Sequence, residues 1–254
     1  LEWGARAEPI LRRMRDGHPL VRGIRRIVEF DQDPRALTLS DDFVAGTFDR
    51  FANTFDRVLA GLEYRAPQLV HQAVAELLGE GRRDLDVADA GVGTGLCGPL
   101  VRPYARTLVG VDLSPQMVAR AKERSIDGAP VYDELVVAEL TAFFADRRDA
   151  FDLIVCADTL CYFGELGAPV GAMAAALRAG GALAFTVEHA PDENERGFVL
   201  HPHGRYSQTE PYVRSVLRQS GLTPKLVELV HLRVERGAPV EGLLVLAAKP
   251  RPLS

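Results

Sequence analysis

The chain has 254 residues, of which 47% are hydrophobic, and a mean hydropathy of −0.02, so it can bury a sizeable core in one large domain or one domain with an appendage. Its 30 Lys and Arg residues against 35 Asp and Glu give a formal net charge of −5, which disfavours nucleic acid as a partner. Three cysteines without a zinc-like spacing, no apolar run near the ~20 residues of a membrane span and no visible signal peptide predict a cytoplasmic protein without disulfides, metal or membrane anchor.

The first 45 residues predict a helical appendage. Between residues 6 and 30, apolar residues recur among seven arginines at the spacing of two short amphipathic helices, broken at Gly17-His18-Pro19. This segment is a candidate for binding a protein partner. We therefore divide the chain into an appendage at 1–45 and a second domain at 46–254.

A second helical region is expected from about residue 41 to residue 78, with Pro67 restarting a helix at its first turn. Phe48, Phe51 and Phe55 lie at near-helical spacing in it and are candidates to cover a bound ligand. A buried helix face is the simpler explanation for at least two of them.

From Asp86 onward, short apolar runs alternate with helical stretches, which is the βαβ pattern of a parallel sheet covered by helices. After a polar loop at 188–208 we expect a helix at about 209–220 and an antiparallel hairpin at the sheet edge, with its turn at 236–239. The pattern predicts an α/β fold: a Rossmann-like, seven-stranded, mostly parallel sheet with helices on both faces and an antiparallel C-terminal strand. The predicted strands cover 87–90, 107–111, 135–138, 151–157, 182–187, 226–232 and 243–248.

A glycine loop follows the first of these strands. The strand ends at Asp89, and Gly91, Gly93 and Gly95 follow with the spacing G-x-G-x-G. Glycines at a first βα turn let the backbone approach a ligand that lies beyond the carboxyl ends of the strands. Dinucleotide sites use G-x-G-x-x-G to seat a pyrophosphate, so the shorter spacing weakens an NAD or FAD interpretation without eliminating it.

Acidic residues close the next two strands. Asp112 ends the second strand, where a carboxylate can accept both hydroxyls of a ribose, and Glu139 follows the third. Ser114 can cap a helix in whose first turn Met117 would pack on an adenine face. Each feature alone is also typical of an ordinary turn, core residue or helix start, but their order along successive βα units predicts a nucleoside pocket.

These residues resemble the class I S-adenosylmethionine-dependent methyltransferases from about Phe48 to the C-terminus. Residues 87–95, 109–114, 151–158 and 177–183 match motifs of that family. The resemblance is closest to predicted methyltransferases with upstream tetratricopeptide repeats, which share residues 64–67, 132–135 and 204–206. The sequence departs from the family at Val92, where Cys is frequent, and at Glu139, where Asp is common.

The resemblance implies S-adenosylmethionine as cofactor, with S-adenosylhomocysteine as product. It assigns Asp89 and the loop glycines to the methionine moiety and Asp112 to the ribose. It places Asp158 beside the sulfonium and the acceptor entrance. The adenine would be held by Leu113, Met117, Glu139 and Leu140.

Methyl transfer from a sulfonium is an in-line displacement, so the protein mainly aligns the reactants and excludes water. A hydroxyl acceptor benefits from a general base, and His189 at the end of the fifth strand is the first candidate. Tyr206 and Asp158 are further candidates for catalysis. The residues expected to contact the acceptor are Tyr162, His203, Arg205 and Tyr206, although an ordinary surface loop explains those of the 188–208 region equally well.

The sequence after Asp158 lacks the Pro-Pro-Tyr run of adenine and glutamine methyltransferases, which disfavours those acceptors. We expect a small-molecule acceptor, with a hydroxyl ahead of an amine or a carbon. Three alternatives stay open: a methyltransferase acting on a protein, a non-catalytic module that binds S-adenosylmethionine, and an NAD-dependent oxidoreductase.

Overall fold

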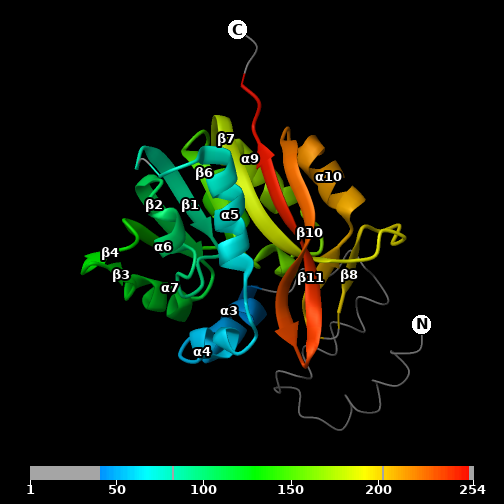
Figure 1. Cartoon of the computed structure of the whole chain (residues 1–254), viewed down its shortest axis with the longest axis horizontal. Helices are drawn as coiled ribbons and strands as arrows, with labels where there is room; N and C mark the ends of the chain where they lie inside the picture. Colours follow the sequence, from blue (N-terminus) through cyan, green and yellow to red (C-terminus); the bar gives the residue numbers. More distant parts are fainter. Residues whose placement is uncertain (1–40, 82, 202, 252–254) are drawn as a thin grey trace.

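The computed structural model describes residues 41–81, 83–201 and 203–251 (Figure 1). Most of the predicted appendage, residues 1–40, lies outside these residues, so the protein partner proposed for it stays a prediction. Among the helices that are described, none combines the length and the apolar character needed to cross a membrane.

Within the described residues, three helices precede the sheet: α3 (Asp41–Phe51), α4 (Phe55–Ala60) and α5 (Ala66–Leu78). Pro67 stands in the first turn of α5, as predicted, where its missing N–H leaves no hydrogen bond unmade. The predicted domain boundary at residue 45 falls inside α3. This helix packs against α7 (Pro115–Lys122), so it is part of the same structural unit as the sheet.

Seven strands form the main path of the sheet in the order β10-β11-β7-β6-β1-β2-β5. Neighbours from β7 to β5 pair in parallel, whereas β11 runs antiparallel to both β7 and β10. The predicted mostly parallel sheet with an antiparallel C-terminal strand is therefore confirmed. The strands are β1 (Leu85–Ala90), β2 (Ala105–Asp112), β5 (Glu134–Val137), β6 (Phe151–Cys156), β7 (Leu177–His189), β10 (Thr223–Glu235) and β11 (Ala238–Ala248), and β3 (Ser125–Ile126) pairs with β4 (Ala129–Pro130) outside this sheet.

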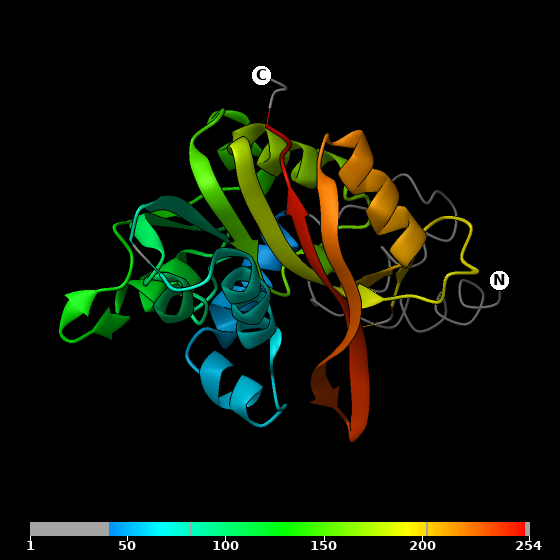
Figure 2. The same ribbon diagram turned by 45° about the horizontal axis from the view of Figure 1, so that its top comes forward.

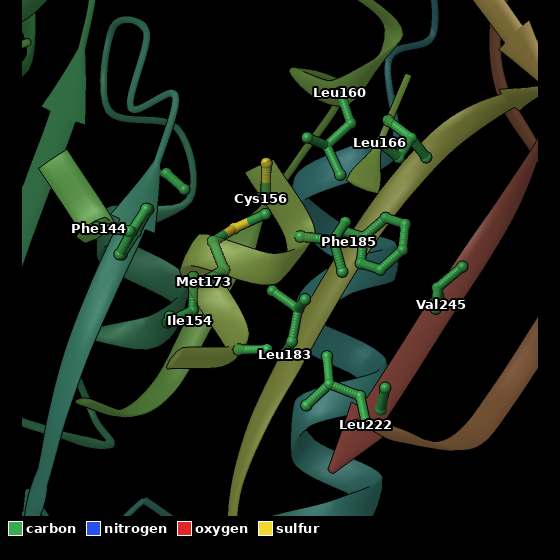
Figure 3. Packing of buried hydrophobic residues seen from close by; sticks show 14 of the residues in the cluster. Phe144, Ile154, Cys156, Leu160, Leu166, Met173, Leu183, Phe185, Leu222 and Val245 are labelled. Carbon is green, nitrogen blue, oxygen red and sulfur yellow. The ribbon is translucent and has the colours of Figure 1, made fainter. Parts of the chain in front are cut away.

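Helices cover both faces of the sheet, which is why its central strands are almost continuously apolar. One core joins the sheet to α8 (Leu140–Ala145), α9 (Gly167–Ala176) and α10 (Glu210–Gln219), and there Met173 packs beside Ile154 and Phe185 (Figure 3). The other core joins it to α5, α6 (Gly98–Val101) and α7.

The segment 188–208, expected to be an irregular loop, contains two short strands. They are β8 (Phe198–Leu200) and β9 (Tyr206–Gln208), and β9 pairs in parallel with the end of β7. Three-residue strands among Gly, Pro and His carry too little periodicity to be recognised in a sequence. Their effect is to fix residues 206–208 against the sheet.

The predicted hairpin is confirmed as β10–β11, joined at Arg236 and Gly237. Both residues have positive φ, 52° and 79°, as a two-residue turn that matches strand twist requires. Only Gly242–Ala248 of β11 pairs with β7, so the rest of the hairpin projects beyond the sheet (Figure 2). The projecting part carries residues 233–235, just before the turn, and Arg233 there pairs with Asp158 and Glu188 at the carboxyl ends of β6 and β7.

Candidate active site

A cavity of about 920 Å³ opens at the carboxyl ends of β1, β2, β5 and β6. Helices α3 and α4 form a second wall. This position matches the general rule for ligand sites in open α/β sheets. The sequence-predicted residues that line it are Asp89, Gly91, Gly93, Asp112, Leu113, Glu139, Leu140, Asp158, Tyr162 and Arg205.

The glycine turn is locked onto β2 by two backbone hydrogen bonds. The N–H groups of Gly91 and Val92 donate to the carbonyl of Val111 at 2.8 and 2.9 Å. Gly91 has a φ of 73°, and a Cβ on it would stand 2.1 Å from Oγ1 of Thr159, so no larger residue fits. Gly93 also has a positive φ, 53°, and lines the cavity, so backbone forms this part of the wall.

Asp112 lies beside this turn at the end of β2. One carboxylate oxygen accepts the N–H of Gly93 at 2.8 Å and the other accepts the N–H of Ser114 at 2.9 Å. Burial raises the pKa of Asp112, and these backbone hydrogen bonds offset the rise only in part. Each oxygen keeps a second lone pair with which it can accept a ligand hydroxyl.

Asp89 is 1% exposed and lies deeper in the same end of the cavity. Its Oδ2 accepts a hydrogen bond from the hydroxyl of Tyr132 at 2.7 Å. Burial raises the pKa of Asp89 to about 7, although the Tyr132 hydrogen bond opposes the rise, and Asp112 adds to it. Asp89 has no cationic partner among the described residues, so a cation bound in the cavity would stabilise its ionised form.

The third acidic side chain has a structural role as well. Glu139 caps α8: its two oxygens accept the N–H groups of Thr141 at 2.8 Å and Ala142 at 2.7 Å. It lines the cavity between Leu113 and Leu140, which offer apolar surface. A flat ring with an amine edge fits such a combination.

Two residues predicted to touch the cofactor are not on the cavity lining. Met117 is fully buried in the first turn of α7, where its N–H donates to the capping Ser114 hydroxyl at 3.1 Å. Gly95, with a φ of 84°, faces the side chains of Arg124 and Tyr132 instead of the cavity. The structure therefore gives both a packing role in the turn, and their cofactor contacts stay predictions.

Phe48 of α3 and Phe55 of α4 line the cavity and are half-buried, so the structure favours their candidate role as a cover over the simpler explanation of a buried helix face. The ring of Phe48 packs edge-on against that of Tyr162, with centroids 5.2 Å apart. Ser114 ties α3 to α7 by donating to Asp49 at 2.6 Å. The Phe51 side chain lies outside the described structure.

At the other end of the cavity, five charged side chains form an ionic cluster. Three carboxylates and two guanidinium groups make it up: Asp158, Glu188, Glu235, Arg205 and Arg233.

Arg233 is the centre of this cluster. It bonds Asp158 at 2.8 Å and Glu235 at 2.6 Å, and it also pairs with Glu188. Arg205 bonds Glu188 at 2.5 Å and Glu235 at 2.6 Å. With one carboxylate in excess when all five groups are ionised, the cluster presents a net charge of about −1 to the cavity.

Asp158 is the member of the cluster closest to the predicted chemistry. It follows β6, has a φ of 53°, and its Oδ1 is buried with no hydrogen-bond partner in the described structure. Burial raises the pKa of Asp158; Arg233 opposes that rise and Glu188 reinforces it. A buried acceptor atom without a donor is costly, so a ligand hydroxyl or N–H at this point would be stabilised.

The sequence did not identify Glu188, Arg233 or Glu235 as site residues. Arg233 and Glu235 are two positions apart in β10, so their side chains share one face of the strand. A charged pair on a strand face is also typical of solvent exposure, but Arg233 is 2% exposed. The spacing of Arg233 and Glu235 was therefore visible in the sequence, but it did not show whether this face of the strand is exposed to solvent or buried.

Three predicted acceptor residues, His189, His203 and Tyr206, do not line the cavity. Tyr206 is fully buried because β9 turns it into the core, where its ring packs against Phe198. His203 is exposed and stacks on His201, and His189 lies 3.8 Å from Asp192. Their catalytic and acceptor-binding roles stay predictions that the cavity geometry does not favour.

Comparison with known proteins gives a family for the central part of the chain. Residues 88–185 match a family model described as "Methyltransferase domain". A curated relative, the malonyl-[acyl-carrier protein] O-methyltransferase of Acetivibrio thermocellus, is 30% identical over 105 residues, which are 40% of this chain. The match spans only 35% of that relative's length.

Solved structures share the architecture. The 1,6-didemethyltoxoflavin-N1-methyltransferase of Burkholderia thailandensis, bound to S-adenosylhomocysteine, is similar with a TM-score of 0.62 and 20% identity over 84% of this chain and 92% of that one. The magnesium protoporphyrin IX methyltransferase of Synechocystis, bound to S-adenosylmethionine, gives a TM-score of 0.52 and 21% identity over 72% and 76%. A methyltransferase from Mesorhizobium loti gives 0.53 and 23% over 70% and 96%. The family model thus matches the central residues 88–185, and the solved structures show that the chain shares their α/β fold.

Proposed function

We propose that this chain is an S-adenosylmethionine-dependent methyltransferase that methylates a hydroxyl of a small molecule, with both molecules bound in the cavity at the carboxyl ends of β1, β2, β5 and β6. The observation that carries the proposal is the contrast between the two ends of one cavity. Glycine backbone and three carboxylates form one end, and the ionic cluster with an unpartnered Asp158 oxygen forms the other. About 920 Å³ is near the upper range of ligand pockets, which is enough for a nucleoside cofactor and a small acceptor.

The residues at the glycine end fit S-adenosylmethionine better than a dinucleotide. The charged side chains there are the carboxylates Asp89, Asp112 and Glu139, which suit ribose hydroxyls, an adenine amine and a cationic methionine group. The cationic side chains on the lining, Arg205 and Arg233, lie in the ionic cluster at the opposite end. A pyrophosphate would therefore meet carboxylates where it needs donors.

When bound, S-adenosylmethionine supplies a methyl group on a positively charged sulfur, so the donor is already activated. The chain's own contribution is alignment and exclusion of water. Phe48 and Tyr162 close an aromatic wall over the cavity. Asp112 and the glycine turn hold S-adenosylmethionine. The ionic cluster holds Asp158 in place to contact the acceptor.

Asp158 is the group we assign to the acceptor proton. Its unpartnered Oδ1 can accept the hydrogen bond of an acceptor hydroxyl and then the proton which that hydroxyl loses as its oxygen is methylated. Its raised pKa strengthens it as a base, because a carboxylate of higher pKa holds a proton better. Tyr64 and Tyr162, which also line the cavity, stay neutral because burial raises their pKa values.

A second candidate is a carboxylate acceptor, which the name of the Acetivibrio thermocellus relative suggests. Two arginines on the lining, Arg205 and Arg233, would be the natural partners. Both already pair with carboxylates, and the cluster is net negative. A free carboxylate would therefore have to displace an existing ion pair, which favours the hydroxyl.

Calorimetric titration with S-adenosylhomocysteine and with NAD tests the cofactor. We expect saturable binding of the first only; binding of NAD alone would overturn the proposal. Acceptors are then screened with methyl-labelled S-adenosylmethionine against small aromatic alcohols, amines and carboxylates. Label transfer to carboxylates but not alcohols would replace the hydroxyl by the second candidate, and cofactor binding with no transfer to any class would favour a non-catalytic module.

Asp158→Asn tests the assigned base once an acceptor is found. We expect turnover to fall by about 10²–10⁴-fold, the usual contribution of a positioned base, while affinity for S-adenosylhomocysteine changes little. Glu165→Gln is the matched control, since Glu165 lines the same cavity but is exposed and lies outside the ionic cluster. Equal turnover of the two variants would remove Asp158 from the reaction.

A further inference from the structure

Tyr132 occupies a slot beneath the glycine turn, and glycines on three elements leave the room for it. A Cβ on Gly98, at the start of α6, would stand 2.4 Å from the Tyr132 hydroxyl oxygen. A Cβ on Gly95 would stand 3.1 Å from the ring, and one on Gly110 of β2 would stand 3.2 Å from it. The ring therefore supports the turn from below, and any side chain at these glycines would crowd it.

The backbone on either side of Tyr132 is held in place. The N–H of Val131 donates to the carbonyl of Arg124 at 3.1 Å, and the N–H of Asp133 donates to that of Leu108 at 2.9 Å. The Asp133 carboxylate accepts the N–H of Leu108 at 2.7 Å. With both neighbours fixed to the body of the domain, the Tyr132 side chain has little freedom.

The hydroxyl of Tyr132 has one recorded side-chain partner, Oδ2 of Asp89, at 2.7 Å. Tyr132 is 7% exposed and Asp89 is 1% exposed, so the bond is shielded from water. Oδ1 of Asp89 accepts no hydrogen bond from the described part of the chain, and Asp89 lines the cavity. The Tyr132 bond therefore leaves the second carboxylate oxygen available to a ligand.

We propose that Tyr132 is a positioning residue of the cofactor site, which favours the ionised form of the Asp89 carboxylate and orients it to receive a cationic group of the cofactor. This inference rests on the proposed function. Tyr132 does not line the cavity itself and acts only through Asp89.

The other groups around Asp89 do not favour its ionised form, so the Tyr132 hydroxyl is needed for that. Asp112 disfavours a second negative charge, and the thiols of Cys97 and Cys156 are neutral because burial raises their pKa values. The Tyr132 hydroxyl is thus the donor that favours the ionised form of Asp89 among the described residues. Burial and the nearby Asp89 raise the pKa of Tyr132, so it keeps its proton and donates throughout the neutral range.

Tyr132→Phe removes the hydroxyl and keeps the ring in its slot. The pKa of Asp89, about 7 in the intact protein, should then rise further. Affinity for S-adenosylhomocysteine should fall about tenfold relative to the unmodified protein at pH 6, but only about twofold or less at pH 9, if the pKa of Asp89 rises by ~1 unit. A purely structural loss would lower affinity by the same factor at every pH.

The measurement is calorimetric titration of the folded protein with S-adenosylhomocysteine between pH 6 and pH 9. Tyr104→Phe is the matched control, because Tyr104 is a buried tyrosine of the same core that does not line the cavity. We expect its affinity profile to coincide with that of the unmodified protein. A pH-independent effect of Tyr132→Phe, or no effect, would overturn the inference.

Asp89→Asn provides the second variant. When Tyr132→Phe is combined with Asp89→Asn, the pH-dependent part of the Tyr132→Phe effect should vanish, because the titrating group is gone. If Tyr132→Phe does not fold, Asp89→Asn is measured alone. The unmodified protein should lose affinity for S-adenosylhomocysteine as the pH falls through about 7, and Asp89→Asn should not show this pH-dependent loss. If Asp89→Asn still showed it, the inference would be overturned. Failure of the unmodified protein to bind S-adenosylhomocysteine would instead overturn the proposed function.

Discussion

Strand β1 carries an aspartate near each end, and the fold surrounds the two carboxylates in opposite ways. Asp86, near the amino end, accepts hydrogen bonds from Arg106 at 2.5 Å and from Thr107 at 2.7 Å and forms an ion pair with Arg178 at 2.9 Å. Burial alone would raise the pKa of Asp86, but these partners outweigh burial and lower it. Asp89, near the carboxyl end, has a tyrosine hydroxyl in place of a cation, and its pKa rises to about 7.

The same difference separates the two ends of the whole sheet. Asp152, near the amino end of β6, pairs with Arg178 at 2.8 Å. At the carboxyl ends, burial raises the pKa of both Asp112 and Asp158. Carboxylates that only hold strands together are neutralised within the chain, whereas those facing the cavity are left partly uncompensated. Under the proposed function, the cationic cofactor supplies the missing charge.

Removing Arg233, the central cation of the ionic cluster at the carboxyl ends, should have the largest effect. Arg233→Ala leaves Asp158 and Glu188 buried without their shared partner. We expect the free energy of unfolding to fall by about 3–5 kcal/mol, the usual cost of breaking a buried ion pair from one side. Urea unfolding followed by circular dichroism measures it, with the exposed Lys225→Ala of the same strand as control. A loss below about 1 kcal/mol would mean that the cluster is far better hydrated than its burial indicates.

Removing the charge of Asp89, which has no cationic partner among the described residues, should instead raise the free energy of unfolding. The pKa of Asp89 in the folded protein is about 7, above the ~3.9 of an unfolded aspartate, so stability from this group is full below pH ~4 and is lost as the pH rises to 7. Asp89→Asn, which keeps an acceptor for Tyr132, should therefore stabilise the ligand-free protein by up to about 4 kcal/mol at pH 8 and by little near pH 4.

Thermal unfolding across this pH range tests the Asp89→Asn expectation. The variant should also bind S-adenosylhomocysteine more weakly than the unmodified protein, so stability and binding would move in opposite directions. Destabilisation at pH 8 would contradict the view that the carboxyl end of β1 is kept strained for a ligand.

Asp112→Ala tests the expected ribose contact of the cofactor. Losing the ribose contacts should weaken binding of S-adenosylhomocysteine by about 1–3 kcal/mol. Glu134→Ala, an exposed carboxylate at the start of the neighbouring β5, is the calorimetric control. Equal affinity of the two variants would remove Asp112 from the cofactor site.

The glycine end of the cavity, with Asp89 and Asp112, could be predicted from the sequence as one cluster because it is built locally. Asp89, Gly91 and Gly93 are nearly contiguous, and parallel strands bring Asp112 to the same edge of the sheet. Their chemistry depends on backbone conformation, which glycine spacing reveals directly.

The ionic cluster at the other end of the cavity could not be predicted in the same way, because side chains from distant segments of the chain form it. Arg233 reaches Asp158 across 75 positions of the chain, through a hairpin whose length beyond the sheet no local pattern sets. Conversely, Tyr206 was expected in the site, but the short strand β9 places it in the core. Tyr132 was noted only within a shared motif, and its support of the glycine turn depends on three glycines in separate elements.

Asp86→Asn gives the smallest expected effect and completes the comparison along β1. Arg106 is 60% exposed and Arg178 is 38% exposed, so solvent screens both pairs, and we expect a loss of about 1 kcal/mol at pH 7. Because the folded pKa of Asp86 is lowered, its contribution is present above the unfolded pKa of ~4 and is lost as the pH falls further. Urea unfolding at pH 7 and in acid should show this loss disappear, with affinity for S-adenosylhomocysteine unchanged. A marked loss of affinity would show that the two ends of β1 are coupled, and the division between structural and ligand-facing carboxylates would then fail.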